Sequence, residues 1–235
     1  MASKIDFDNL NVVGVNEDIE NAIHDEISTY FSEMELEESE IDERIALGID
    51  LEKNFRNLFI LISAIAITGN TIEEKQATLE ADKEYLYDKA YWGYADTLIN
   101  NGFYDTEYFD IGDGYVAKYI KQQSQNIVDS SILYQADSYY MSVGRSILCG
   151  ENEANAVANY EREQKAILKG YTKKTWITKR DKRVRRSHII ADGETVGIFD
   201  AFEIGKYQMM FPLDASLGAE AEEIVRCRCV CKYSK

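Results

Sequence analysis

The side chains of this sequence best suited to bind a metal lie near its C-terminal end. Cys227, Cys229 and Cys231 alternate in the segment Cys-Arg-Cys-Val-Cys, and His188 precedes them. Thiolate and imidazole are ligands that zinc prefers, so these four side chains could hold one ion. If residues 225–230 form a strand, the three cysteines share one face. Ligands two residues apart on a strand chelate one ion awkwardly, however, and we favour buried cysteine packing over a zinc site.

A second possible site pairs Asp181 with His188, which follows it by seven residues. A carboxylate beside an imidazole fixes its tautomer and raises its pKa, and a catalytic acid–base pair begins in this way. The same arrangement is typical of a structural histidine, and we favour that interpretation. The alternative is a small nuclease or hydrolase that uses His188 and Asp181. We assign no catalytic residue and expect no enzyme activity.

Positive charge is concentrated around this pair. Arginine can bind a phosphate or a carboxylate through two parallel hydrogen bonds. The basic residues are Lys173, Lys174, Lys179, Arg180, Lys182, Arg183, Arg185 and Arg186. Contact with DNA and docking onto an acidic partner fit these residues equally well, and a solvated loop is the simplest alternative.

The order of residue types across this region resembles one known family. Lys-x-Trp-x-Thr begins at position 174 and Asp-x-Arg-Val-Arg-x-Ser-His at position 181, followed by Asp-Gly, a phenylalanine, a proline and Cys-Arg-Cys. This set is similar to the signature of the Mu F-like minor head protein (phage head morphogenesis) family over residues 174–229. The matching positions are Trp176, Asp181, Arg183, Arg185, Ser187, His188, Asp192, Gly193, Phe202, Pro212, Cys227, Arg228 and Cys229.

The resemblance implies a structural role rather than an enzymatic one. The chain would be a minor capsid protein of a tailed phage that assists head assembly or DNA delivery. Its expected partners are the portal and capsid proteins, with packaged DNA as a further candidate. Its expected location is the virion, inside the head or at the portal vertex, after assembly in the host cytoplasm. No cofactor is expected, with zinc as the alternative left open. The resemblance leaves residues 1–140 without an assigned role.

Charge divides the chain into two regions. The formal net charge is −16, but residues 1–163 hold 11 Lys and Arg against 33 Asp and Glu, whereas residues 164–235 hold 15 against 9. The acidic region should be repelled by nucleic acid, whereas the basic region can meet a phosphate backbone or an acidic protein surface. This distribution argues against a protein that simply coats DNA.

Apolar periodicity predicts that the acidic region is helical. Apolar residues recur at three- and four-residue steps, and Thr71-Ile72-Glu73-Glu74 has the form of a capping box. The predicted helices cover residues 16–34, 39–67, 71–99, 115–148 and 152–168. The most apolar run, residues 58–67, is shorter than the roughly 20 residues needed to cross a bilayer, so no membrane contact is expected. The N-terminal residues also lack the pattern of a secretory signal.

The region after Gly170 has a different pattern. β-Branched and aromatic residues predict strands at 175–178, 195–199 and 224–230, and Asp192-Gly193 predicts a tight turn. Trp176 and Phe202 are expected to anchor a small core. The predicted fold is therefore α+β, with a mostly helical, acidic N-terminal body (residues 1–170) and a small, basic, β-containing C-terminal module (residues 171–235).

Overall fold

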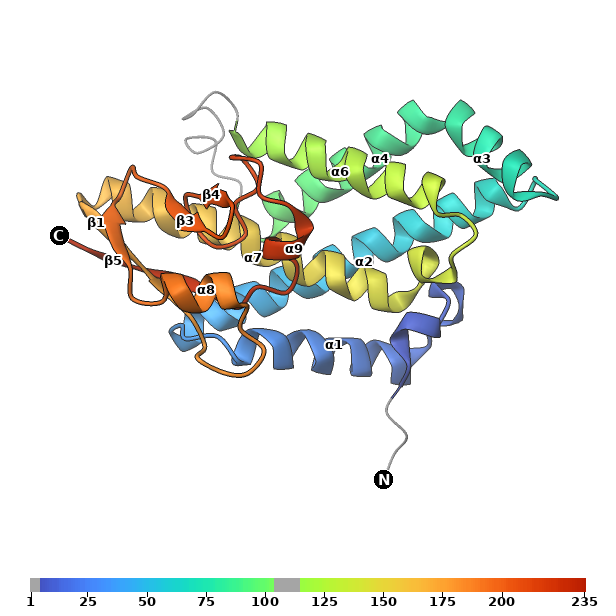
Figure 1. Ribbon diagram of the computed structural model, residues 1–235. Coiled ribbons are helices and arrows are strands. Elements are labelled where there is room, and N and C mark those ends of the chain that lie inside the picture. Colours follow the sequence, from blue (N-terminus) through green and yellow to red (C-terminus); the bar gives the residue numbers. More distant parts are fainter. Residues whose placement is uncertain (1–4, 104–114) are drawn as a thin grey trace. The chain divides into compact units, whose positions relative to one another are not determined.

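The computed structural model describes residues 5–103 and 115–235 (Figure 1). The chain forms two compact units, the first from Met1–Glu26 and Leu47–Gly150 and the second from Ile27–Ala46 and Glu151–Lys235. The predicted C-terminal module falls within the second unit, which also takes in helical residues from earlier in the chain. The connection rich in tyrosine and phenylalanine before Tyr115 lies largely outside the described residues.

The fold is α+β, with helices in most of the N-terminal part and small sheets near the C-terminus. The longer helices are α1 (Glu17–Ser32), α2 (Glu38–Ala66), α3 (Ile72–Ala81), α4 (Lys83–Asn100), α6 (Tyr115–Leu133) and α7 (Val143–Leu168). Short 3-10 turns occur at η1 (Phe7–Asn9), η2 (Val12–Gly14) and η3 (Ser138–Met141). None of the helices in the described ranges combines the length and apolarity needed to span a bilayer.

Two helix boundaries differ from those predicted. The third predicted helix is divided at Asp82, which caps the C-terminus of α3 and precedes α4 with φ −99° and ψ 10°. The pattern predicted to continue to residue 148 ends at Leu133, and α7 then runs without interruption through Gly150. A Cβ at Gly150 would lie 2.7 Å from the carbonyl oxygen of Gly48, so glycine permits close packing of α2 and α7 there rather than ending a helix.

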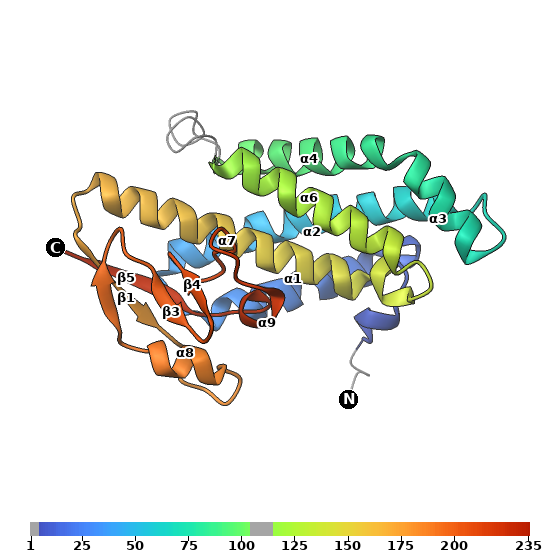
Figure 2. The same ribbon diagram turned by 45° about the horizontal axis from the view of Figure 1, so that its top comes forward.

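The first unit is built from helices around an apolar core. Helices α4 and α6 lie side by side (Figures 1 and 2). The guanidinium of Arg145 stacks over the rings of Phe59 and Tyr140, with its Cζ 4.7 and 4.6 Å from their centroids. Capping of α3 follows the prediction, because Thr71 and Glu74 exchange side-chain to backbone hydrogen bonds.

The second unit contains all the strands of the described chain. Strand β1 (Lys173–Ile177) pairs antiparallel with β2 (Thr195–Gly197) on one edge and with β5 (Val230–Ser234) on the other. Strands β3 (Phe202–Ile204) and β4 (Tyr207–Met209) form a separate hairpin. Two short helices, α8 (Arg186–Ala191) and α9 (Ala221–Ile224), complete the unit, and α8 lies beside β3 (Figures 1 and 2).

The third predicted strand is wrong in position. Residues 221–224 form helix α9, and β5 begins only at Val230. Between them Arg226 adopts a φ of 53°, in the left-handed region, and its backbone N–H donates to Oδ1 of Asn152 at 2.8 Å. A strand cannot continue through that conformation, so Cys227 and Cys229 lie in an irregular segment instead of on a strand face.

A buried polar network holds the second unit together. Arg44, on α2, donates from Nε to Oδ1 of Asn155 at 3.2 Å and from Nη2 to Oδ1 of Asn159 at 2.8 Å, both on α7. The amide of Asn155 donates to the carbonyl oxygen of Cys227 at 3.0 Å, and that of Asn159 to the carbonyl oxygen of Pro212 at 2.9 Å. One guanidinium therefore orients two amides that bind two separate C-terminal segments.

We predict that Arg44→Ala lowers the free energy of unfolding by about 3 kcal/mol, because it leaves two buried amide oxygens without donors and creates a cavity. Burial also lowers the pKa of Arg44 to about 10, which reflects how little water reaches this group. Urea denaturation followed by circular dichroism measures the change. Lys53→Ala, at an exposed position on the same helix, is the control and should change stability by less than about 0.5 kcal/mol. Equal effects of the two substitutions would contradict a stabilising role for the network.

Candidate metal centre and the motif residues around it

His188, Cys227 and Cys229 converge in the interior of the second unit. His188 comes from α8, and both cysteines come from the irregular segment between α9 and β5. Nδ1 of His188 lies 3.3 Å from Sγ of Cys229 and 3.5 Å from Sγ of Cys227. The three potential ligand atoms all lie within 4.8 Å of one another, and His188 is only 1% exposed. Two thiols and an imidazole nitrogen thus face a common point.

The carboxylate beside His188 is Glu223, not Asp181 as the sequence suggested. Nε2 of His188 lies 3.1 Å from Oε2 of Glu223, although the two are not aligned as a hydrogen bond. The hydroxyl of Ser187 donates to the same oxygen at 2.7 Å. A carboxylate on this side favours the proton on Nε2 and directs the lone pair of Nδ1 toward the sulfurs. The only signal of Glu223 in the sequence is its position four residues before Cys227 in an acidic run.

Asp181 instead forms a fork-like ion pair with Arg228. Its two carboxylate oxygens accept hydrogen bonds from Nη1 and Nη2 of Arg228 at 2.7 and 2.8 Å. Glu33, which follows α1, accepts from both Arg228 and Arg183. Hydrogen bonds from Arg228, aided by one from the backbone of Arg183, hold the pKa of Asp181 well below its usual range. Asp181 and Arg228 therefore fasten the loop after β1 to the segment that carries the cysteines.

Trp176 forms one wall of the centre. Alternation along β1 turns Lys174 and Trp176 inward. The indole ring meets the ring of His188 edge-on at 5.4 Å and that of Phe202 at 5.2 Å. The predicted roles of Trp176 and Phe202 as core anchors are confirmed. Nε1 of Trp176 is buried without a hydrogen-bond partner among the described residues, which is rare for a polar group in a protein interior.

Hydrogen bonds to its backbone hold the cysteine segment in place. The hydroxyl of Tyr30, on α1, donates to the carbonyl oxygen of Cys227 at 2.9 Å, beside the bond from Asn155. The guanidinium of Arg185 donates to the carbonyl oxygen of Val225. These hydrogen bonds come from three parts of the chain. They position the backbone of the cysteine segment, so the places of the two thiols do not depend on contacts of the sulfur atoms themselves.

Cys231, the remaining candidate ligand of the possible zinc site, does not belong to the cluster and is buried instead. It lies on β5, in register with Trp176, and borders a groove of about 640 Å³ that includes Arg162. Burial raises the pKa of its thiol to about 12. Cys227 and Cys229 precede the strand, in the irregular segment, and their sulfurs face His188. The groove is lined by acidic and basic side chains together, so its charge selects no ligand.

Two of the candidate contact residues bind groups of this chain. Lys174 is fully buried, and its Nζ lies 2.6 Å from Oε1 of Glu163 on α7. Burial raises the pKa of Glu163 to about 7, and the nearby ammonium of Lys174 opposes that rise. Arg185 is occupied by the carbonyl oxygen of Val225. Both residues were candidates for contact with DNA or a partner; Lys174 is too deeply buried for such a contact, whereas Arg185 is half-buried.

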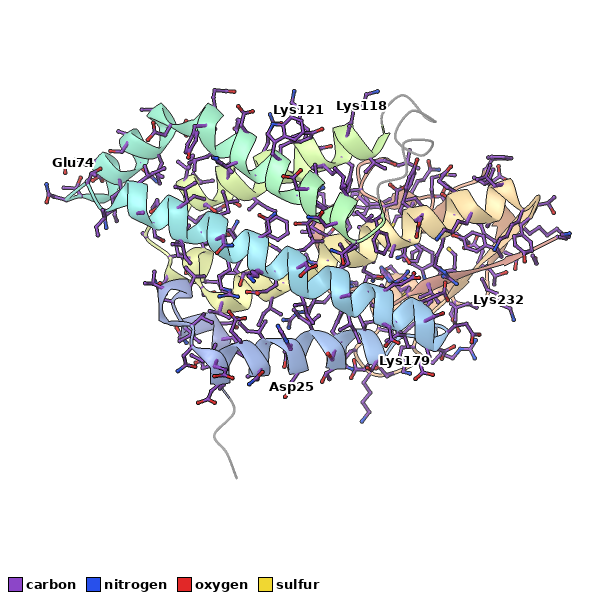
Figure 3. All side chains as sticks on the ribbon, turned by 180° about the vertical axis from the view of Figure 1, so that it is seen from behind. Asp25, Glu74, Lys118, Lys121, Lys179 and Lys232 are labelled. Carbon is purple, nitrogen blue, oxygen red and sulfur yellow. The ribbon has the colours of Figure 1, made fainter. Side chains whose placement is uncertain are left out.

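The other basic residues divide into paired and exposed groups. Arg180 donates to Asp192 at 2.7 Å, and Arg183 pairs with Glu33. Exposed cations to which the described structure gives no ion pair are Lys173, Lys182 and Arg186. Lys179 is half-buried, and its side chain extends outward from the ribbon (Figure 3).

The predicted turn at Asp192-Gly193 is confirmed. Oδ1 of Asp192 accepts from the backbone N–H of Thr178 at 2.9 Å, and Gly193 has a φ of 84°. The N–H of Gly193 donates to the carbonyl oxygen of Trp176 at 2.8 Å. Only glycine adopts such a φ without strain, so the turn returns the chain from α8 to the sheet.

Comparisons with models of known families, with curated proteins and with solved structures find no match for this chain.

We predict that Asp181→Asn lowers the free energy of unfolding by about 1 kcal/mol at pH 7, because the carboxylate is partly exposed whereas Arg228 is nearly buried. The folded pKa of Asp181 lies below its unfolded value, so the ion pair contributes its full stability above the ordinary pKa of about 3.9 and loses it as pH falls toward the folded value. Urea denaturation from pH 7 to pH 3 measures the difference, which should shrink below about pH 4.

The matched control is Asp25→Asn, at an exposed position on α1 that Figure 3 labels. It should change stability by less than about 0.5 kcal/mol. If the difference between the protein and Asp181→Asn stays constant down to pH 3, the Asp181–Arg228 pair does not act as described.

Proposed function

We propose that this chain is a minor head protein of a tailed phage, which associates with portal or capsid protein and assists head assembly or DNA delivery. The observation that carries the proposal is the ordered set of motif residues from Lys174 to Cys229, which resembles the Mu F-like head-morphogenesis signature. No single element of that set is specific, but the whole order is difficult to obtain by chance.

The contacts of the motif residues support one module rather than a coincidence of types. Trp176 packs on His188 and Phe202, and Asp181 binds Arg228. Residues from both ends of the motif thus depend on each other in the folded unit. Such mutual dependence accounts for a fixed order of residues without requiring any of them to touch a substrate.

The exposed cations of the same unit supply a surface for a partner. Lys173, Lys182 and Arg186 are exposed and have no ion pair among the described residues, whereas Arg180 and Arg183 bind acids of this chain and Arg185 donates to a carbonyl oxygen. Their charge favours an acidic protein surface or a phosphate backbone. The acidic helical region would oppose extended DNA contact, so a protein partner is the primary proposal.

The geometry does not favour the alternative of a nuclease or hydrolase based on His188 and Asp181. General acid–base catalysis needs the imidazole within hydrogen-bond reach of substrate. His188 is buried against Trp176 and the two cysteines, and Asp181 binds Arg228. The two residues of the alternative catalytic pair therefore each make a separate structural contact and do not bind one another.

The direct test is co-expression with a tailed-phage portal protein, and separately with a capsid protein of the same phage, followed by size-exclusion chromatography with mass detection at moderate salt. Co-elution at a fixed stoichiometry is the expected result. Clean separation from both portal and capsid protein, with folding shown by circular dichroism, would refute the proposal.

We further predict that the triple variant Lys173→Gln, Lys182→Gln and Arg186→Gln weakens this association several-fold at low salt, because each substitution removes an exposed charge that steers binding. The loss should diminish as salt is raised. The control triple variant, Lys53→Gln, Lys118→Gln and Lys121→Gln, changes net charge equally in the first unit. Equal weakening by both variants would assign the effect to net charge and not to this surface.

A further inference from the structure

The cluster of His188, Cys227 and Cys229 has the composition and geometry of a metal site. We propose that these three side chains bind one zinc ion, with Nδ1 of His188 and the two thiolates as protein ligands and a solvent molecule as the fourth. The inference rests on the positions of the side chains and does not depend on the proposed function.

The distances between ligand atoms match a tetrahedral zinc site. With Zn–N near 2.0 Å and Zn–S near 2.3 Å, neighbouring nitrogen and sulfur atoms of a tetrahedral site lie about 3.5 Å apart. The observed separations from Nδ1 of His188 are 3.3 and 3.5 Å. The two sulfurs, within 4.8 Å, would need at most a small side-chain rotation to reach about 3.8 Å. Soft sulfur with imidazole in this geometry selects zinc over harder cations such as magnesium.

The surroundings of His188 fit a metal ligand better than a packed histidine. A zinc-bound imidazole commonly gives its other N–H to a carboxylate, which orients the ring and raises its basicity. Glu223 occupies that position, 3.1 Å from Nε2, and is itself held by Ser187. The unaligned contact leaves Nε2 without a hydrogen bond, and a small rotation of the ring toward the metal would allow one to form. Glu223 is thus a positioning residue and not a ligand.

The objection that cysteines two apart chelate poorly applies only to an extended strand. Here the left-handed Arg226 precedes Cys227, and bonds from Tyr30 and Asn155 hold the Cys227 carbonyl. This local conformation brings both sulfurs toward Nδ1 of His188. The ligands are therefore ordered before any ion binds, which limits the entropy lost on binding.

A small cavity beside the cluster provides for the fourth ligand. Its volume of about 10 Å³ is close to that needed by one water molecule, and its lining includes all three ligand residues. Arg183, Arg185 and Arg228 also line it. Their positive charge favours water in its hydroxide form, or a small anion, at the open position.

Zinc would cross-link α8 to the segment that leads into β5. Binding converts two thiols to thiolates and releases two protons, so affinity should fall at low pH. Because the ligands are joined through the ion, the bound state should resist unfolding and protect both thiols from alkylation.

The first experiment is zinc analysis of the full chain, purified without chelator, by inductively coupled plasma mass spectrometry. We expect a zinc-to-chain ratio near one and a fall in melting temperature on removal of zinc by a strong chelator. Folded protein that remains zinc-free, even after incubation with zinc chloride at micromolar excess, would overturn the proposal.

Substitution of Co²⁺ reports the ligands directly. The wild-type chain should show sulfur-to-cobalt charge transfer and the visible bands of tetrahedral Co²⁺. Both should be lost or strongly reduced in Cys227→Ser and Cys229→Ser and retained in Cys149→Ser, a cysteine outside the cluster. Spectra in folded Cys227→Ser and Cys229→Ser identical to that of the wild-type chain would contradict the assigned ligands. Should either variant fail to fold, the wild-type spectrum alone decides whether thiolate binds the ion.

A conservative change tests the orienting carboxylate. Glu223→Gln should weaken zinc binding about 10- to 100-fold in competition with a chromophoric chelator, with the tetrahedral Co²⁺ spectrum preserved. Glu222→Gln, next to it on α9 but bonded to Tyr207, is the control and should leave the affinity unchanged. Equal affinities of the two variants would remove Glu223 from the site.

Discussion

The second unit depends on the buried guanidinium of Arg44. Its donors go to the amide oxygens of Asn155 and Asn159 and, weakly, to a backbone carbonyl of its own helix. Those amides are then oriented so that their N–H groups face the carbonyl oxygens of Cys227 and Pro212. A buried charge is costly unless every donor is satisfied, so this arrangement admits few alternatives.

This network is linked to the candidate metal centre through one backbone oxygen. The carbonyl of Cys227 accepts from both Asn155 and Tyr30, and this places the residue that carries one of the sulfurs. Glu223, just upstream, then faces Nε2 of His188, while Cys227 and Cys229 face Nδ1. The polarity of the imidazole ring is therefore set from both sides, by a carboxylate on one and by thiols on the other.

The charge pattern of the basic residues does not show which of them are free to bind a partner. They form a single run in the sequence, yet Lys174 is buried with Glu163, Arg185 holds a carbonyl oxygen, and Arg180 and Arg183 bind acids of this chain. What remains for a partner is a smaller set at exposed positions. The family-like order of residues is in large part a set of internal contacts.

Local patterns in the sequence determined much of the fold. Periodic apolar residues predicted α1 and α2 nearly to their ends, alternation predicted β1, and Asp192-Gly193 predicted its turn. These features depend on neighbours within a few residues, where side-chain spacing and backbone preference act directly. The change to a β-containing module after Gly170 was visible for the same reason.

Only the tertiary structure decided which side chains meet. Asp181 lies near His188 in the sequence but binds Arg228, while Glu223 reaches His188 from a separate short helix. Cys231 leaves the cysteine group because Arg226 turns the chain before β5 begins. Pairing across long stretches of sequence depends on how distant segments pack and on which buried polar groups must be satisfied, and no local pattern records that information.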